Sequence, residues 1–252
     1  MNIVIGDFNI YYEKIGNGKK NILILPGWGD TRATFKWMID ILKKDYCVYI
    51  IDYPGFGKSQ FPNRDLTVYD YAEMIKVFLD VLSIKNPIVI AHSFGSRLSL
   101  ILNGKMGVFM EKLIIIDGAG IKKRKKLSSI LRQYFYKFLK SLRFILPKKF
   151  KKQYMNKLIN IFGSSDYKAL SDNMKRTFSN IVSEDLSYLL DYINVETLLI
   201  WGENDNDTPV SDGIKMNERI KDSGLVIIKK GTHFSYLDAP FYVNNIIINF
   251  IS

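Results

Sequence analysis

The sequence predicts an α/β fold in which a mostly parallel sheet is covered by helices on both faces. Short apolar runs alternate along the chain with segments whose apolar residues recur at helical spacing. The later runs are continuously apolar, as in strands that are buried on both faces. Such alternation is typical of β–α–β units, and 252 residues that are 47% hydrophobic and 24% charged can build a sizeable core.

The predicted strands cover residues 8–13, 22–25, 46–51, 87–91, 113–116, 197–201 and 225–229. The second and third of these stop at Pro-Gly turns. The first ends at a Gly-Asn-Gly turn, residues 16–18, which predicts a hairpin with the second. Helices are expected near residues 35–42 and 71–82, where apolar side chains recur every three or four positions.

The alternation breaks between residues 121 and 192, where no strand pattern is convincing. We therefore expect a core domain made of residues 1–120 and 193–252, with a helical insertion at 121–192. Inside the insertion, residues 127–145 carry an apolar stripe with basic residues largely off it, which predicts an amphipathic helix that Pro147 ends.

The net charge of +11 is concentrated in this insertion. Between Lys122 and Arg176 the chain has 17 basic residues but only two acids, Asp166 and Asp172, so the rest of the chain is mildly acidic. No nucleic-acid recognition motif accompanies the charge, which argues against nucleic acid as a partner. Lys, Ile and Asn are all abundant in this chain, as AT-rich coding sequence produces, and this bias also contributes to the net positive charge.

A serine stands at a sharp strand-to-helix turn in residues 88–98. The apolar run leads directly into Ser93, and a helical pattern follows at once. Such a turn needs very small residues two positions before and after the serine, and Ala91 and Gly95 supply them. The hydroxyl then stands at the carboxyl edge of the sheet, where open α/β sheets bind ligands.

At this turn the sequence resembles the α/β-hydrolase superfamily, whose nucleophile elbow is G-x-S-x-G. Here it reads Ala-His-Ser-Phe-Gly, which implies that Ser93 is the nucleophile. Residues 25–30 look like the family's H-G-x-G oxyanion loop with Pro26 in place of the histidine. The resemblance implies that the backbone N–H groups of Trp28 and Phe94 hold the oxyanion. Residues 52–59 resemble the family's D-x-x-G-x-G-x-S loop, to which we assign a structural role.

The resemblance also implies an acid after a late strand. Residues 202–209 match the family's G-x-x-D-x-x-x-P turn, which places Asp205 in the acid's position and Pro209 at its end. Two alternatives stay open: Asp207, two residues further on, and Asp117, which follows an earlier strand where some family members place the acid.

The chain has only two histidines, His92 and His233. His92 adjoins Ser93 in the elbow, so its side chain should point away from the hydroxyl. His233 follows the last strand in a segment similar to the family's G-H-F-x-x-x-x-x-P pattern, with Thr232 inserted. It comes third in the order Ser, Asp, His that the fold requires, which implies that it is the base.

The resemblance thus implies a serine hydrolase that cleaves a carboxylic ester or thioester with no metal or organic cofactor. A second hypothesis is cleavage of a C–C or amide bond, which some relatives carry out with the same triad. A third hypothesis is a non-catalytic binding protein on this scaffold. The single cysteine, Cys47, is interpreted as a buried thiol. The absence of a signal peptide, a long apolar run or a disulfide framework favours the cytoplasm.

In the family the insertion is a lid that selects the substrate. Its apolar stripe would suit a small-molecule acyl substrate. The favoured interpretation of its basic face is a lysine-rich surface exposed to solvent. The alternatives are docking of an anionic carrier such as acyl carrier protein or coenzyme A, and contact with an anionic lipid surface.

Overall fold

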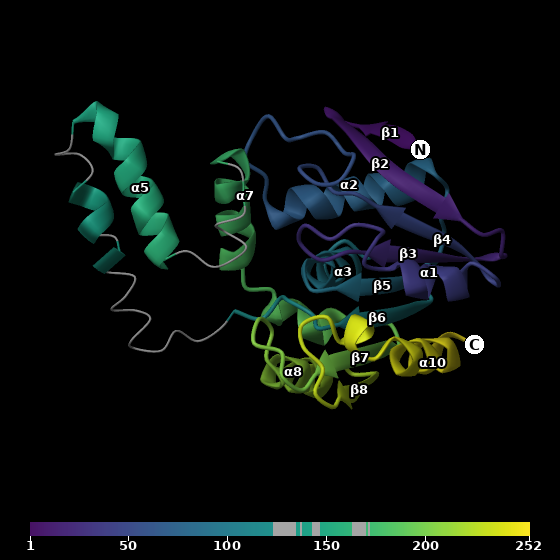
Figure 1. Cartoon of the computed structure of the whole chain (residues 1–252). Coiled ribbons are helices and arrows are strands. Elements are labelled where there is room, and N and C mark those ends of the chain that lie inside the picture. The colour runs from purple at the N-terminus through teal and green to yellow at the C-terminus, as the bar shows by residue number, and fades with distance from the viewer. Residues whose placement is uncertain (123–134, 137, 143–146, 163–169, 171) are drawn as a thin grey trace.

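The chain folds around one eight-stranded sheet with the strand order β1-β2-β4-β3-β5-β6-β7-β8 (Figure 1). The computed structural model describes residues 1–122, 135–136, 138–142, 147–162, 170 and 172–252. The strands are β1 (Asn2–Ile5), β2 (Phe8–Ile15), β3 (Lys20–Leu25), β4 (Tyr46–Ile51), β5 (Ile88–His92), β6 (Lys112–Ile116), β7 (Thr197–Gly202) and β8 (Ser223–Ile228). Only β2 runs antiparallel to its neighbours, β1 and β4, so the predicted mostly parallel sheet is confirmed.

Helices cover both faces of the sheet. The helices of the core are α1 (Lys36–Leu42), α2 (Val68–Val81), α3 (Phe94–Gly104), α8 (Val210–Arg219), α9 (Ser235–Asp238) and α10 (Pro240–Ile251). Phe78, Leu98 and Met216, from α2, α3 and α8, belong to one apolar cluster with side chains of the sheet. Ile39 and Ile247, from α1 and α10, belong to a second cluster, formed with the strand side chains of the opposite face. This two-sided core explains why the central strands are apolar throughout.

The predicted hairpin between residues 8–13 and 22–25 is wrong. β2 instead pairs with β1 across a two-residue turn in which Gly6 has a φ of +54°. β3 lies in the centre of the sheet, between β4 and β5. The Gly-Asn-Gly segment crosses the start of β4 at close range, because a Cβ on Gly18 would lie 2.0 Å from the carbonyl oxygen of Asp45. The glycines there allow a close backbone approach rather than a hairpin turn.

The regular structure described between β6 and β7 is helical, with non-helical connections between the helices. It contains α5 (Lys148–Phe162), α7 (Asp172–Ser183) and the 3₁₀ helix η2 (Ser187–Tyr192). The amphipathic helix predicted at residues 127–145 lies largely outside the described residues. In Figure 1, α7 stands beside the main body and α5 lies beyond it. No described helix combines the length and the apolarity needed to cross a bilayer.

Hydrogen bonds join α7 and the end of the insertion to the core. The Leu66 N–H donates to the Thr177 hydroxyl of α7 at 3.0 Å. The Leu186 N–H donates to the Gly120 carbonyl at 2.9 Å, so the chain leaving β6 and the chain returning toward β7 are paired. These contacts fix α7 over the carboxyl ends of the central strands.

Candidate active site

Four loops at the carboxyl ends of parallel strands carry the residues that the sequence singled out. Trp28 follows β3, Ser93 follows β5, Asp205 follows β7 and His233 follows β8. Since these strands run parallel, their carboxyl ends share one edge of the sheet. The topology therefore gathers residues that lie up to 205 positions apart in the sequence.

The turn at Ser93 has the strained geometry expected of an elbow. Ser93 adopts φ 46° and ψ −109°, a conformation that non-glycine residues rarely occupy. Its N–H donates to the Ile116 carbonyl at 3.1 Å, which holds the turn against β6. A Cβ on Gly95 would lie 2.0 Å from the Leu25 carbonyl oxygen, so the expected need for a very small residue is confirmed. Phe94 begins α3, and its N–H therefore has no acceptor within the helix.

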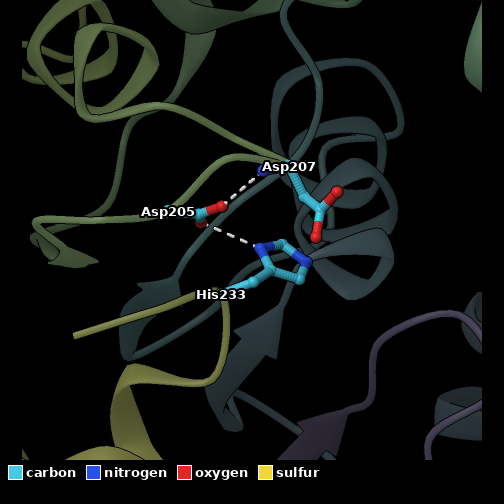
Figure 2. A group of neighbouring side chains, drawn as sticks. All are labelled: Asp205, Asp207 and His233. Atoms are coloured by element: carbon cyan, nitrogen blue, oxygen red, sulfur yellow. Dashed lines mark hydrogen bonds and ion pairs between the residues drawn. The ribbon is translucent and has the colours of Figure 1, made fainter.

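Ser93, His233 and Asp205 form a continuous hydrogen-bonded chain. The Nε2 atom of His233 lies 2.8 Å from the Ser93 Oγ, and its Nδ1 atom lies 2.8 Å from the Asp205 Oδ2. Figure 2 shows the second of these contacts. The Asp205 side chain is fully buried, whereas the His233 side chain keeps 15% of its surface exposed. The structure thus brings together the three residues that the sequence predicts as nucleophile, acid and base, with His233 between the other two.

Hydrogen bonds from the loop after β7 hold the Asp205 carboxylate. The backbone N–H groups of Asp207 and Thr208 donate to its Oδ1 at 2.8 and 2.9 Å, and the Thr208 hydroxyl donates to its Oδ2 at 2.7 Å. Burial alone would raise the pKa of Asp205, but the bonds from His233 and Thr208 lower it below its ordinary value. No role for Thr208 was predicted, because its only signal in the sequence is its place inside the acid turn.

The environment of His233 favours its protonated form. Burial of the ring disfavours the charge, but the hydrogen bond and negative charge of Asp205 outweigh it, and Asp117 and Asp207 add smaller attractions. The net effect raises the pKa of His233 above its ordinary value. Asp205 thereby stabilises an imidazolium at the position where a base would acquire a proton.

The two alternative acids serve other contacts. Asp207 reaches Asp205 through its backbone N–H (Figure 2). Asp207 is also one of the residues that line the cavity described below. Asp117 is fully buried and accepts the Gly202 N–H at 2.7 Å, the Ser235 N–H at 3.0 Å and the Ser235 hydroxyl at 2.6 Å. Asp117 therefore ties the loops after β6, β7 and β8 together.

Asp205, Asp207 and His233 are also the one group of potential metal ligands found among the described residues. Their ligand atoms lie within 4.8 Å of one another. However, both ring nitrogens of His233 are hydrogen-bonded to Ser93 and Asp205. The geometry is that of a proton-transfer chain.

The ring of His92 points away from the Ser93 hydroxyl, as expected. Its Nδ1 atom lies 2.9 Å from the Asp30 Oδ2, and its Nε2 atom lies 2.8 Å from the backbone oxygen of His233. Neither contact was predicted from the sequence, because Asp30 lies 62 positions away and a backbone acceptor leaves no signature in the sequence.

A cavity of about 570 Å³ opens onto the Ser93 hydroxyl. Its walls are mainly apolar and come from the core and from α7; they include Trp28, Phe94, Phe178, Ile181 and Val182. The Trp28 ring packs edge-on against Phe94 at 5.2 Å between centroids and lies 5.4 Å from Phe178. Such a space accommodates a small or medium apolar group beside the nucleophile.

Comparison with known proteins indicates the family to which this fold belongs. The family model for the alpha/beta hydrolase fold matches residues 20–184. A pimeloyl-[acyl-carrier protein] methyl ester esterase of Wigglesworthia glossinidia brevipalpis is 29% identical over 96% of this chain and 97% of its own length. A 2-hydroxy-6-oxononadienedioate/2-hydroxy-6-oxononatrienedioate hydrolase of Pseudomonas putida is 24% identical over 98% of this chain and 93% of its own length.

Among solved structures, an esterase from Exiguobacterium antarcticum superposes with a TM-score of 0.74 at 22% identity and covers 97% of this chain and 96% of its own. That likeness concerns the fold. The family match spans more than half of the chain, and the sheet order, the elbow and the helical insertion agree with it. The chain therefore belongs to the α/β-hydrolase fold family.

Proposed function

We propose that this chain is a serine hydrolase that cleaves a carboxylic ester or thioester through an acyl-enzyme on Ser93. The supporting observation is the hydrogen-bonded chain from the Ser93 Oγ through the His233 ring to the Asp205 carboxylate, with 2.8 Å at both contacts. A binding protein would have no need of this arrangement. The similarity to named esterases and hydrolases over most of the chain adds support.

In this proposal His233 removes the proton from Ser93 as the hydroxyl oxygen attacks the substrate carbonyl carbon. Asp205 fixes the ring so that Nδ1 carries hydrogen and Nε2 is free to accept the proton. The protonated ring then gives its proton to the leaving group as the acyl-enzyme forms. Water, activated by the same ring, attacks the acyl-enzyme and releases the acid and the free Ser93 hydroxyl.

The backbone N–H groups of Trp28 and Phe94 would stabilise the negative oxygen of the tetrahedral intermediate. Phe94 supports this role because its N–H starts α3 without an intrahelical acceptor. Trp28 supports it because the residue lies on the loop after β3 and lines the cavity beside Ser93. The dipole of α3 adds positive potential at the same point.

The pH dependence of hydrolysis should report the environment of His233. The base must be neutral to accept a proton, so kcat/KM rises with pH through the pKa of His233. Because that pKa is raised, the rising limb is expected above about pH 6.5, the ordinary histidine value. The pH profile of kcat/KM for the wild type measures this limb.

Two acids near His233 provide matched variants for the same measurement. Asp205→Asn should move the limb to lower pH because the main attraction is removed. Asp207→Asn should move it in the same direction but less, since Asp207 contributes only a smaller charge term. A limb that stays in place in both variants would show that it belongs to another group.

The cavity size should set the acyl-chain preference. On p-nitrophenyl esters of increasing acyl length, we expect activity on short and medium chains and a decline on long ones. Phe178→Ala widens the α7 wall and should raise activity on the longest esters about tenfold. Phe61→Ala, at an exposed position outside the cavity, is the control and should leave the profile unchanged. Wild-type protein that is inactive on every ester would contradict the proposed reaction.

Hydrolysis of a C–C bond by the same triad is a second candidate, favoured by the similarity to the Pseudomonas putida hydrolase. Assaying the wild type on a 2-hydroxy-6-oxo dienedioate beside the ester series separates the two reactions. A much higher kcat/KM on the dienedioate would assign the chain to C–C bond cleavage, and a higher value on esters would assign it to ester cleavage.

In the same proposal, residues 121–192 act as the lid, and its basic face meets an anionic carrier or lipid surface. The described helix α5 contains five lysines and no acid. The similar Wigglesworthia enzyme acts on an ester bound to acyl carrier protein. Salt-sensitive binding to anionic liposomes without any esterase activity would instead favour a non-catalytic binding function on this scaffold.

A further inference from the structure

Arg97 places a positive charge inside the cavity that opens onto Ser93. It lies on α3, four residues after the serine, and both residues line the cavity. Four residues correspond to about one helical turn, so the two backbones are separated by roughly 6 Å along the helix. Only 7% of Arg97 is exposed. The cavity therefore holds a buried cation close to the proposed nucleophile.

Most hydrogen-bond donors of the Arg97 guanidinium are not used by the protein. In the part of the chain that the structure describes, its one hydrogen bond runs from Nη1 to the Glu184 carbonyl oxygen at 3.0 Å, and no carboxylate pairs with it. The two nearby acids are engaged elsewhere. The Glu184 carboxylate accepts the Tyr69 hydroxyl at 2.8 Å, and the Asp185 carboxylate accepts the Ser187 N–H at 3.1 Å.

Burial makes this unpaired charge costly. Loss of hydration lowers the pKa of Arg97 to about 10, although the charges of Asp185 and Glu184 oppose the change from a distance. The side chain is still a cation at neutral pH, and a buried charge normally has an opposite charge beside it. Tying α3 to the Glu184 carbonyl uses only one donor of the guanidinium. The remaining donors suit an anion that enters the cavity.

The shape of the site favours a carboxylate at the end of an apolar chain. A guanidinium is a planar fork that matches a carboxylate through parallel hydrogen bonds. The wall that leads to it is apolar, because Ile181 and Val182 line the cavity and directly precede the segment whose Glu184 carbonyl contacts Arg97. A methylene chain along this wall would carry its terminal carboxylate to the guanidinium.

The acids at the other side of the cavity indicate which half of the substrate carries the charge. In the proposed reaction His233 gives its proton to the leaving group, which therefore lies beside the imidazole ring. Asp207 lines the cavity there, with a ligand atom within 4.8 Å of those of His233 and Asp205. Asp212 of α8 lines the cavity as well. An anionic leaving group would be repelled, so the charge belongs on the acyl half.

We propose that the substrate is a half ester or half thioester of a dicarboxylic acid, whose free carboxylate binds Arg97 while Ser93 attacks the esterified end. The inference rests on the proposed function, because it names the substrate class of the same site. Hydrolysis of the half ester consumes one water and releases the alcohol, a dicarboxylate and one proton. Arg97 is a specificity-determining residue, since it contacts the substrate but not the reacting atoms.

The first test compares substrates that differ by one charge. Monomethyl and dimethyl adipate share a carbon chain, and so do monomethyl and dimethyl suberate, which are longer. For at least one of the two pairs, kcat/KM of the wild type should be about tenfold to a hundredfold higher on the half ester. Titration of the acid released measures both rates. Equal values within both pairs, or a preference for the diesters, would overturn the inference.

Substitutions at Arg97 should change this preference. Arg97→Met removes the charge but keeps a long side chain, and should lower the ratio of half-ester to diester kcat/KM about tenfold to a hundredfold. Arg97→Lys keeps the charge without the planar fork and should retain part of the ratio. Lys85→Gln removes an exposed cation outside this cavity and is the control with the wild-type ratio. Equal losses on both substrates in Arg97→Met would show a merely structural role and overturn the inference.

Binding to Ser93→Ala separates the inference from the proposed reaction, because it needs no turnover. By isothermal titration calorimetry, Ser93→Ala should bind the preferred half ester about tenfold more tightly than its diester, and adding Arg97→Met should abolish the difference. Equal binding of half ester and diester would overturn the inference even if the wild type hydrolyses both. Tighter binding of the half ester, with no hydrolysis of any ester by the wild type, would contradict the proposed function and leave the Arg97 carboxylate site established.

Discussion

Replacement of Ser93 by alanine is expected to lower kcat for ester hydrolysis by about a millionfold. The Ser93 hydroxyl stands 2.8 Å from the His233 Nε2, and alanine leaves the proposed base with no proton to remove. Residual hydrolysis would come from the oxyanion donors and substrate binding alone. Single-turnover and steady-state assays on the same p-nitrophenyl ester measure the loss.

Ser96 is a matched control for this substitution. It lies on the first turn of α3, is fully buried, and its hydroxyl has no hydrogen-bond partner in the described part of the chain. Ser96→Ala removes the same atom three residues away and should leave kcat unchanged. Equal losses in the two variants would show that alanine disturbs the elbow rather than the chemistry.

Replacement of Asp205 by asparagine is expected to lower kcat by about ten thousandfold. The asparagine amide would meet the ring with a donor or hold it in the wrong tautomer, so His233 could not present a free Nε2 to Ser93. The fold should tolerate the change, because Asp207 and Thr208 can still donate to the amide oxygen. Steady-state kinetics and thermal unfolding of the same preparation measure both effects.

Asp117→Asn is the contrasting substitution. Asp117 is another buried carboxylate at a strand end, but its three bonds go to Gly202 and Ser235. Losing one acceptor there should lower the free energy of unfolding by about 1–3 kcal/mol. Its kcat should fall far less than that of Asp205→Asn. The reverse pattern, a stable but inactive Asp117→Asn protein, would make Asp117 the acid.

Much of the fold could be predicted because the strands and their turns are local features. The apolar runs that become β4 to β7 are almost wholly buried strands, and each is a largely continuous apolar stretch of the sequence. The run that becomes β8 is equally apolar, but β8 lies at the edge of the sheet and is mostly half-exposed. The order of the strands is not local. The Gly-Asn-Gly segment had the composition of a hairpin, but close packing against Asp45 decided its structure. Residues 2–5 pair with β2 instead.

The contact between Ser93, His233 and Asp205 could be predicted because each residue stands in a motif at a strand end. The contacts that hold these residues in place could not be predicted, since they depend on how the chain folds back on itself. The bond from His92 to the His233 carbonyl spans 141 positions and ends on a backbone atom, which any residue type provides. The Thr208 hydroxyl supports Asp205 only because the loop after β7 folds back on itself. The cavity wall that α7 provides depends on helix packing, which the sequence does not specify locally.

Labelling with a fluorophosphonate probe tests the central claim most directly, because such probes react only with an activated serine. Intact mass and peptide mapping should show one adduct per chain, on the peptide that contains Ser93. The adduct should be absent from Ser93→Ala and form far more slowly in His233→Ala. No adduct on the wild type, or an adduct that persists in Ser93→Ala, would contradict the assignment of Ser93, His233 and Asp205 as an assembled catalytic triad.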